Sequence, residues 1–172
     1  WIQNNEALAV SDYIACLGST DRFLVRHEPD ISTHTIERLI KKTNPSILIL
    51  NVVDKISRPR RRGSQTNDVE ELRQLHVWAR GLASKHDCIV FGIVQADATA
   101  EGEKWIYQNQ LYGSKTGVQG EADVMVTIGR TYDPSEAAYR FIHVPKNKLP
   151  GDKGTDPARK HGFFSVNFDP LR

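Results

Sequence analysis

The chain has 172 residues, of which 39% are hydrophobic and 26% are charged, and its formal net charge is +2. These values are ordinary for a soluble globular protein and predict a single domain over residues 1–172. No apolar run is long enough to span a membrane, and two cysteines, Cys16 and Cys88, are too few for a disulfide framework or a zinc site. We therefore expect a cytoplasmic protein with no membrane partner.

Apolar runs alternate with amphipathic segments, which is typical of an α/β fold with a largely parallel sheet. The first expected elements are, in chain order, a strand end at 1–2, a helix at 6–17, a short strand at 22–27 and a helix that reaches residue 42. Gly18 would end the first helix, and Ser32 or Thr33 would cap the second.

Two uninterrupted apolar runs, at 47–53 and 88–95, predict strands that are covered on both faces. Between them, residues 68–86 have the spacing of a long amphipathic helix. A third buried strand is expected at 123–129. Two alternating runs, at 139–144 and 163–168, predict antiparallel strands at the C-terminal edge of the sheet. The expected fold class is α/β, with a mostly parallel sheet, helices on both faces and antiparallel strands added at that edge.

The stretch Gly-Ser-Lys-Thr-Gly at 113–117 looks like a phosphate-binding loop but does not satisfy the pattern of one. A Walker A loop reads G-x-x-x-x-G-K-[ST] between a strand and a helix, so that backbone N–H groups and the lysine surround the phosphates. Here Ser114 separates Gly113 from Lys115, and we expect a strand to follow instead of a helix. No other stretch fits the pattern, so the sequence contains no P-loop.

Polar residues follow several apolar runs at the points where strands are expected to end. They are Glu6 after the first, Asn51 and Asp54 after the second, and Gln95 and Asp97 after the third. Ligands of open α/β sheets gather beyond the carboxyl ends of the strands, and such side chains could position a water against a phosphate. Polar residues also end strands that have no catalytic role, so both interpretations stay open.

The order of these features resembles the RecA-type motor domain of DnaB-like replicative helicases, and phage-encoded members in particular. The segments that carry the resemblance are NNE at 4–6, ILILN at 47–51, IVQAD at 93–97, GEADVMV at 120–126 and KNKLPG at 146–151. The resemblance covers nearly the whole chain but begins after the Walker A region of the family. Because the chain also starts at Trp1 without an initiator methionine, we expect a fragment or a processed piece.

The resemblance implies a role for five residues. Glu6 matches the glutamate that polarises the attacking water as a general base, and Gln95 matches the glutamine that senses the γ-phosphate. Asn51 falls where the family has the Walker B aspartate, which holds Mg²⁺ through water. Lys146 and Lys148 match the basic fingers that reach the nucleotide of the neighbouring subunit. The implied cofactors are ATP and Mg²⁺.

Two positions depart from the family pattern. Asn51 is neutral and would hold a hydrated divalent ion less strongly than a carboxylate does, although Asp54 could compensate. Lys148 stands where the family usually has an arginine, and a point charge replaces a planar fork of donors there.

Two basic segments are candidates for contact with single-stranded DNA. Lys115, with Gly113 and Gly117 beside it, falls in the position of the central-channel loop of the family, which grips DNA phosphates. The second segment contains a cluster of arginines: Arg58, Arg60, Arg61 and Arg62. Charges this close repel one another unless an anion is near, so nucleic acid is a reasonable partner. Either segment could equally be a solvated surface loop.

The resemblance implies part of an ATP-dependent DNA helicase for DNA replication, which would act as a hexameric ring, with a primase or loader as a possible partner. A phage-encoded protein would act in the cytoplasm of the bacterial host. Without a P-loop, this chain alone is expected to be inactive. The alternatives are a non-catalytic RecA-like module for nucleic-acid binding or assembly, and a recombinase-like ATPase that forms filaments; sequence does not separate a ring from a filament.

Overall fold

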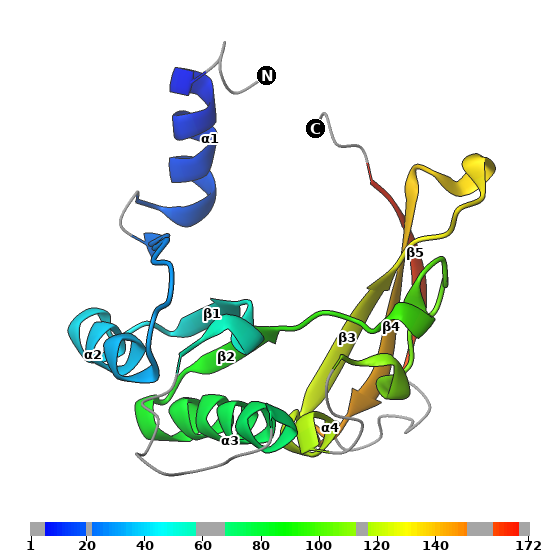
Figure 1. Ribbon diagram of the computed structural model, residues 1–172. Helices are drawn as coiled ribbons and strands as arrows, with labels where there is room; N and C mark the ends of the chain where they lie inside the picture. The colour runs from blue at the N-terminus through cyan, green and yellow to red at the C-terminus, as the bar shows by residue number, and fades with distance from the viewer. Residues whose placement is uncertain (1–5, 20–21, 58–67, 113–116, 151–159, 169–172) are drawn as a thin grey trace. The chain divides into compact units, whose positions relative to one another are not determined.

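The structure is a computed structural model that describes residues 6–19, 22–57, 68–112, 117–150 and 160–168 (Figure 1). The chain divides into two compact units, one made of residues 1–29 with 169–172 and the other of residues 30–168. In the first unit, helix α1 spans Glu6–Leu17. It ends at Gly18, which has a φ of +80° and donates its N–H to the carbonyl of Ile14 at 2.7 Å. The predicted helix and its glycine end are confirmed, whereas the strand expected at 22–27 is wrong, because those residues form no strand.

The second unit begins with helix α2, Thr33–Thr43. The hydroxyl of Ser32 caps it by accepting the N–H of Thr35 at 3.2 Å. At the other end, Asn44 adopts a left-handed conformation and donates its N–H to the carbonyl of Ile40. The predicted cap at residue 32 is therefore confirmed.

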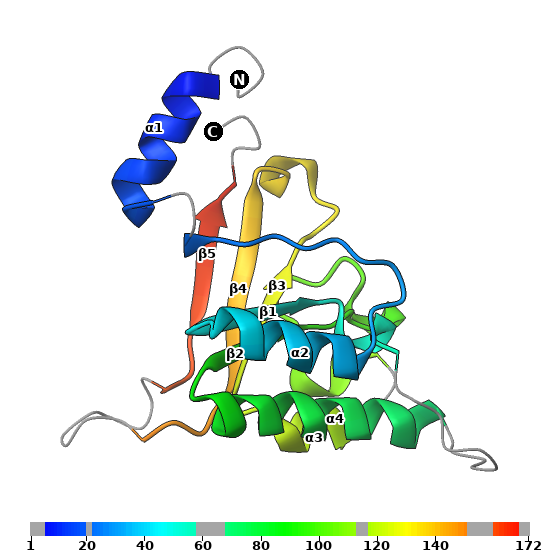
Figure 2. The same cartoon turned by 90° about the vertical axis from the view of Figure 1, so that its left-hand side faces the viewer.

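Strand β1 (Ile47–Asn51) pairs in parallel with strand β2 (Ile89–Ile93), and helix α3 (Asp68–His86) connects them along the chain. Helices α2 and α3 cover the same face of this sheet, as Figure 2 shows. The core beneath them consists of Ile36, Ile40, Leu50, Val53, Ile56, Leu75, Ala79 and Leu82. Side chains from both helices, from β1 and from the short 3-10 turn after it (Val53–Lys55) thus share one apolar layer.

The opposite face of this sheet is exposed. The prediction that helices cover both faces of these strands is therefore wrong. Five large apolar side chains lie there: Ile47, Ile49, Ile89, Phe91 and Ile93. A continuous apolar run predicts that both faces avoid water, but it does not say which segment covers each face. Among the helices that the structure describes in this unit, α2 and α3 cover one face of the sheet, and none covers the other face.

The remaining strands form a separate antiparallel sheet in the order β3-β4-β5, with β3 at Val124–Gly129, β4 at Tyr139–Asn147 and β5 at Phe163–Asn167. The antiparallel arrangement of the last two strands is confirmed, but the prediction that they extend the edge of the parallel sheet is wrong, because they belong to a separate sheet. The expectation that the run at 123–129 continues the parallel sheet is wrong, because β3 pairs with β4 and not with β2. Burial alternates along β3, which leaves Val126 and Ile128 exposed.

A long connection leads from β2 to β3 and ends in a short helix, α4, Gly117–Glu121. A helix thus precedes the strand after the Gly-Ser-Lys-Thr-Gly stretch, where the sequence predicted that a strand follows directly. Leu111, Val118 and Met125 form a second core cluster, against which Leu72 of α3 and Val94 pack. This cluster connects α3, α4 and β3. Within the described residues, no helix is long and apolar enough to cross a lipid bilayer.

Candidate functional site

The ends of β1 and β2 lie at the same edge of the parallel sheet, because Asn51 is paired with Ile93. Asn51 is exposed, and so is Gln95, two residues beyond the end of β2. The structure therefore brings these two predicted residues to one edge, as the order of apolar runs and polar residues suggested.

The backbone around Gln95 is hydrogen-bonded to residues 110–112, which directly precede residues 113–116. The carbonyl of Gln95 accepts the N–H of Tyr112 at 3.1 Å, and the N–H of Asp97 donates to the carbonyl of Gln110 at 2.9 Å. Between these bonds, Ala96 and Leu111 form an isolated antiparallel bridge. The strand end and the approach to residues 113–116 are thus one hydrogen-bonded unit. Asp97 itself caps a turn, since its carboxylate accepts the N–H of Thr99 at 2.8 Å.

Asp54 turns toward helix α3 and not toward solvent. Its Oδ1 lies 4.0 Å from Nε2 of His76, and neither buried atom has a hydrogen-bond partner among the residues that the structure describes. Burial raises the pKa of Asp54 and lowers that of His76, although each group partly offsets the shift of the other.

These donors do not make a complete site for Mg²⁺. The ion is usually held by one or two carboxylates together with phosphate oxygens and water. Here the exposed donor is the neutral amide of Asn51, and the nearby carboxylate oxygen of Asp54 faces an imidazole. In the described part of the chain, no three His, Cys, Asp or Glu side chains gather closely enough to hold a metal ion.

The two predicted finger lysines contact the C-terminal end of α4 in their own chain. Nζ of Lys146 donates to the carbonyl of Gln119, and Nζ of Lys148 donates to the carbonyl of Gly120 at 3.1 Å. Carbonyls at a helix end have no partner within the helix and favour a cation. Burial and the neighbouring Lys148 lower the pKa of Lys146. Lys148 is exposed, so it remains accessible to an external anion.

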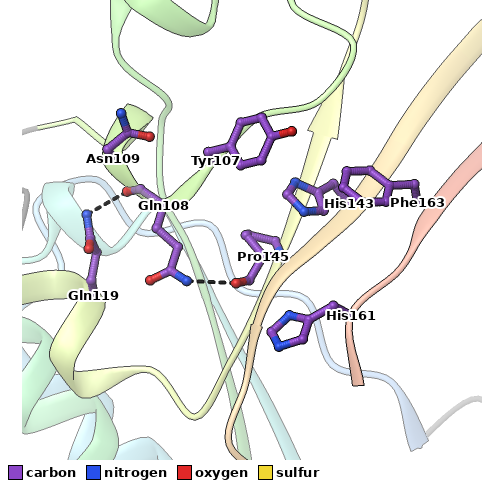
Figure 3. Close-up of a pocket in the computed structure, with 8 residues that line it drawn as sticks. All are labelled: Tyr107, Gln108, Asn109, Gln119, His143, Pro145, His161 and Phe163. Atoms are coloured by element: carbon purple, nitrogen blue, oxygen red, sulfur yellow. Dashed lines mark hydrogen bonds between the residues drawn. The ribbon is translucent and has the colours of Figure 1, made fainter. Parts of the chain in front are cut away.

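An open pocket of about 370 Å³ is shown in Figure 3. It adjoins Lys146, which donates to the carbonyl of the lining residue Gln119. Its lining residues are Tyr107, Gln108, Asn109, Gln119, His143, Pro145, His161 and Phe163. Figure 3 shows the rings of Tyr107, His143, His161 and Phe163 on one side and the side-chain amides of Gln108, Asn109 and Gln119 on the other. The sequence did not predict this pocket. The sequence feature that could have indicated this pocket is His143, the only polar residue in the apolar run FIHV (141–144) of β4.

Two of the solved structures that are similar to this chain have a TM-score of 0.60 or more. One is described as the ATPase domain of its protein; it has a TM-score of 0.60 and 18% identity, and the match covers 80% of this chain and 48% of that one. The other is described as a DnaB-like replicative helicase and its interactions with primase; it has a TM-score of 0.62 and 16% identity, and the match covers 81% of this chain and 34% of that one. The α/β fold of this chain is therefore similar to the folds of these two proteins.

The chain spans about half the length of the similar ATPase domain and about a third of the DnaB-like helicase. At such low identity the similarity establishes the fold and not the activity. No family model matches the chain, and no curated protein does either.

The roles of several predicted residues stay predictions. Glu6 is the first residue of α1 in the first unit, whereas Asn51 and Gln95 belong to the second. Gly117 begins α4. Six others lie outside the described residues: Arg58, Arg60, Arg61, Arg62, Gly113 and Lys115.

Proposed function

We propose that this chain is part of the motor of an ATP-dependent DNA helicase, which couples ATP hydrolysis at subunit interfaces to movement along single-stranded DNA and to duplex unwinding. The observation that carries the proposal is the hydrogen-bonded unit between Gln95 and Tyr112. These hydrogen bonds connect the end of β2, where a nucleotide would be sensed, to the residues directly before the segment 113–116, which contains Lys115. The RecA-like fold and its match to a DnaB-like helicase support the same function.

In this proposal, Glu6 polarises the attacking water and Gln95 senses the terminal phosphate. Lys146 and Lys148 stabilise the nucleotide held by the next subunit of a homo-oligomeric, hexameric ring. Both lysines would first release the carbonyls of α4. A typical hydrogen bond contributes only about 0.5–1.5 kcal/mol net, and one to a charged group about 1.5–3 kcal/mol, so this release is feasible.

ATP and Mg²⁺ are the proposed cofactors, with Asn51 as a weak ligand of the hydrated ion. The sequence contains no P-loop lysine and no adjoining hydroxyl to complete the site. We therefore expect the purified 172-residue chain to lack ATPase activity. Robust turnover by this chain would contradict the assignment of roles.

The exposed apolar face of β1 and β2 also suits a part of a larger assembly. Contiguous apolar patches of this kind on a monomer usually mark an interaction surface. We propose that a further part of a longer motor protein, or an adjoining subunit, covers Ile49 and Phe91. A primase or a loader is a further proposed partner, since the similar helicase is described with its interactions with primase.

The response of single-strand binding to salt tests the DNA contact. If Lys115 and the arginine cluster at 58–62 neutralise about three to five phosphates, the affinity for oligodeoxythymidylate should fall with log[salt] at a slope of about −2 to −3.5. Lys115→Ala should make that slope shallower by about 0.7. Lys42→Ala, at the exposed end of α2, is the matched control and should leave the slope unchanged. Binding that does not depend on salt would refute the proposed DNA contact.

A non-catalytic RecA-like module for nucleic-acid binding or assembly is the second candidate. It is favoured by the neutral Asn51 and by Asp54, whose carboxylate faces His76. The gene upstream of Trp1 distinguishes the two candidates. A strand followed by G-x-x-x-x-G-K-[ST] is expected for the motor, and a start codon at that point is expected for the module.

A further inference from the structure

The aromatic side of the pocket is held rigidly from beneath. His143 is only 3% exposed, and its ring stacks on Phe163 with centroids 4.2 Å apart and planes 10° apart. Nδ1 of His143 lies 2.9 Å from the carbonyl of Ile106, which also accepts the hydroxyl of Thr127 at 2.8 Å. Trp105 contacts the ring of Phe163 edge-on at 5.0 Å. The rings that reach the pocket therefore lose little freedom when a ligand binds.

Two of these fixed rings are half exposed to solvent. Tyr107 is 49% exposed and Phe163 is 53% exposed. The rings of Tyr107 and His143 form an edge-to-face pair, with centroids 4.9 Å apart and planes at 71°. Exposed rings on a rigid support bind planar groups by stacking, and aromatic stacking tolerates any nucleobase.

The amide side of the pocket offers groups for the edge of a heterocycle. Nε2 of Gln108 donates to the carbonyl of Pro145 at 2.7 Å, and Nε2 of Gln119 donates to the carbonyl of Gln108 at 2.6 Å. These bonds leave both Oε1 atoms as acceptors, and the side chain of Asn109 has no partner among the described residues. Acceptors together with a free amide match the mixed donors and acceptors of a base edge. The volume is at the small end of the range for ligand sites, about 300–1,000 Å³.

Positive charge adjoins the pocket. Lys146 follows the lining residue Pro145 and donates to the carbonyl of the lining residue Gln119. Lys148 donates to the next carbonyl, that of Gly120. Two ammonium groups this close favour a nearby anion. The pocket and its rim thus suit a ligand that combines a planar heterocycle with a phosphate.

We propose that this pocket binds the base of a nucleotide, with the base against Tyr107 and its phosphate toward Lys146 and Lys148. The source is either a single strand, in which case the site rests on the proposed DNA-binding function, or a free nucleotide. If the ligand is a single strand, the pocket contacts a base in addition to the contacts that other residues make with phosphates. The affinity for the strand then depends on whether it carries bases.

Quenching of tryptophan fluorescence tests this site, because Trp105 touches the ring cluster. The probes are an oligodeoxythymidylate, an abasic strand of equal length, and thymidine and adenosine 5′-monophosphates. Stacking contributes about 1–3 kcal/mol per base, so the base-carrying strand should bind about tenfold more tightly than the abasic one. Tyr107→Leu should abolish this preference, whereas Tyr107→Phe should retain it.

Tyr139→Leu is the matched control, since Tyr139, the first residue of β4, is also exposed but does not line the pocket. It should leave the preference unchanged. Equal binding of both strands with a normal salt response would overturn the base pocket and leave the proposed DNA contact intact. Binding of a monophosphate that depends on Tyr107, without binding of any strand, would support the pocket with a free nucleotide as its ligand and refute the proposed DNA contact. A preference that survives Tyr107→Leu would overturn the proposal.

Discussion

Replacement of Gly129 by alanine should damage the support of the aromatic pocket. Gly129 is the last residue of β3, and a Cβ added there would lie 2.5 Å from the carbonyl oxygen of Glu103 and 2.7 Å from the carbonyl carbon of Lys104. Cβ atoms essentially never approach other heavy atoms to less than 3.0 Å. The obstacle is backbone, so no flexible side chain can move aside, and either the strand or the 103–104 segment must shift.

The cost should be near the upper end of the range for overpacked sites. Added methyl groups in well-packed regions usually cost about 1–3 kcal/mol, and a clash with backbone offers little relaxation, so we expect about 3 kcal/mol. Trp105 and Ile106 follow the displaced segment directly, and the Ile106 carbonyl holds both Thr127 and His143. The ring cluster should therefore loosen along with the strand end.

Urea unfolding followed by circular dichroism measures the loss, with Gly81→Ala as the control. Nothing lies within 4 Å of a Cβ added at Gly81, which is in the middle of α3, so that variant should gain about 0.5–1 kcal/mol. Tryptophan emission from Trp105 should change in Gly129→Ala only. If Gly129→Ala unfolds at the same urea concentration as the unmodified chain, the inferred packing of β3 against residues 103–104 is wrong.

Three further predictions concern other parts of the chain. Burial lowers the pKa of His76. The neutral imidazole therefore contributes its full stabilisation above the ordinary histidine pKa of about 6.5, and this stabilisation is lost as the pH falls below that value. His76→Gln should flatten the dependence of the urea midpoint on pH between about 8 and 5, and equal slopes in both proteins would refute this. Lys85→Ala removes an exposed ion pair with Glu37 and should cost less than about 1 kcal/mol of unfolding free energy. Glu37→Ala also removes the acceptor of the Trp78 Nε1–H and should cost about 1–2 kcal/mol more. Equal losses in urea unfolding would contradict the inferred role of the hydrogen bond between Trp78 and Glu37. A phosphate-release assay on the purified chain should detect no ATP hydrolysis, as argued above from the missing P-loop.

Sequence by itself determined the elements whose signals are local. The helix at 68–86 follows from apolar spacing, and the start of the helix at 33–43 follows from the cap at Ser32. The strands after residues 46 and 88 follow from apolar runs, and the shared edge of Asn51 and Gln95 follows from placing polar residues at parallel strand ends. Each of these depends on interactions within one segment or on a simple rule of sheet geometry.

Tertiary structure alone decided which segments meet. Alternating apolar residues in β3 are compatible with several neighbours, and only pairing across the chain assigned it to β4 in an antiparallel sheet. The orientation of Asp54 toward His76 depends on how α3 packs, which no local pattern encodes. The pocket combines residues near 107, 119, 143 and 161, which lie far apart in the sequence. Such contacts depend on the free energy of the whole packed unit, so a chain read one segment at a time cannot predict them.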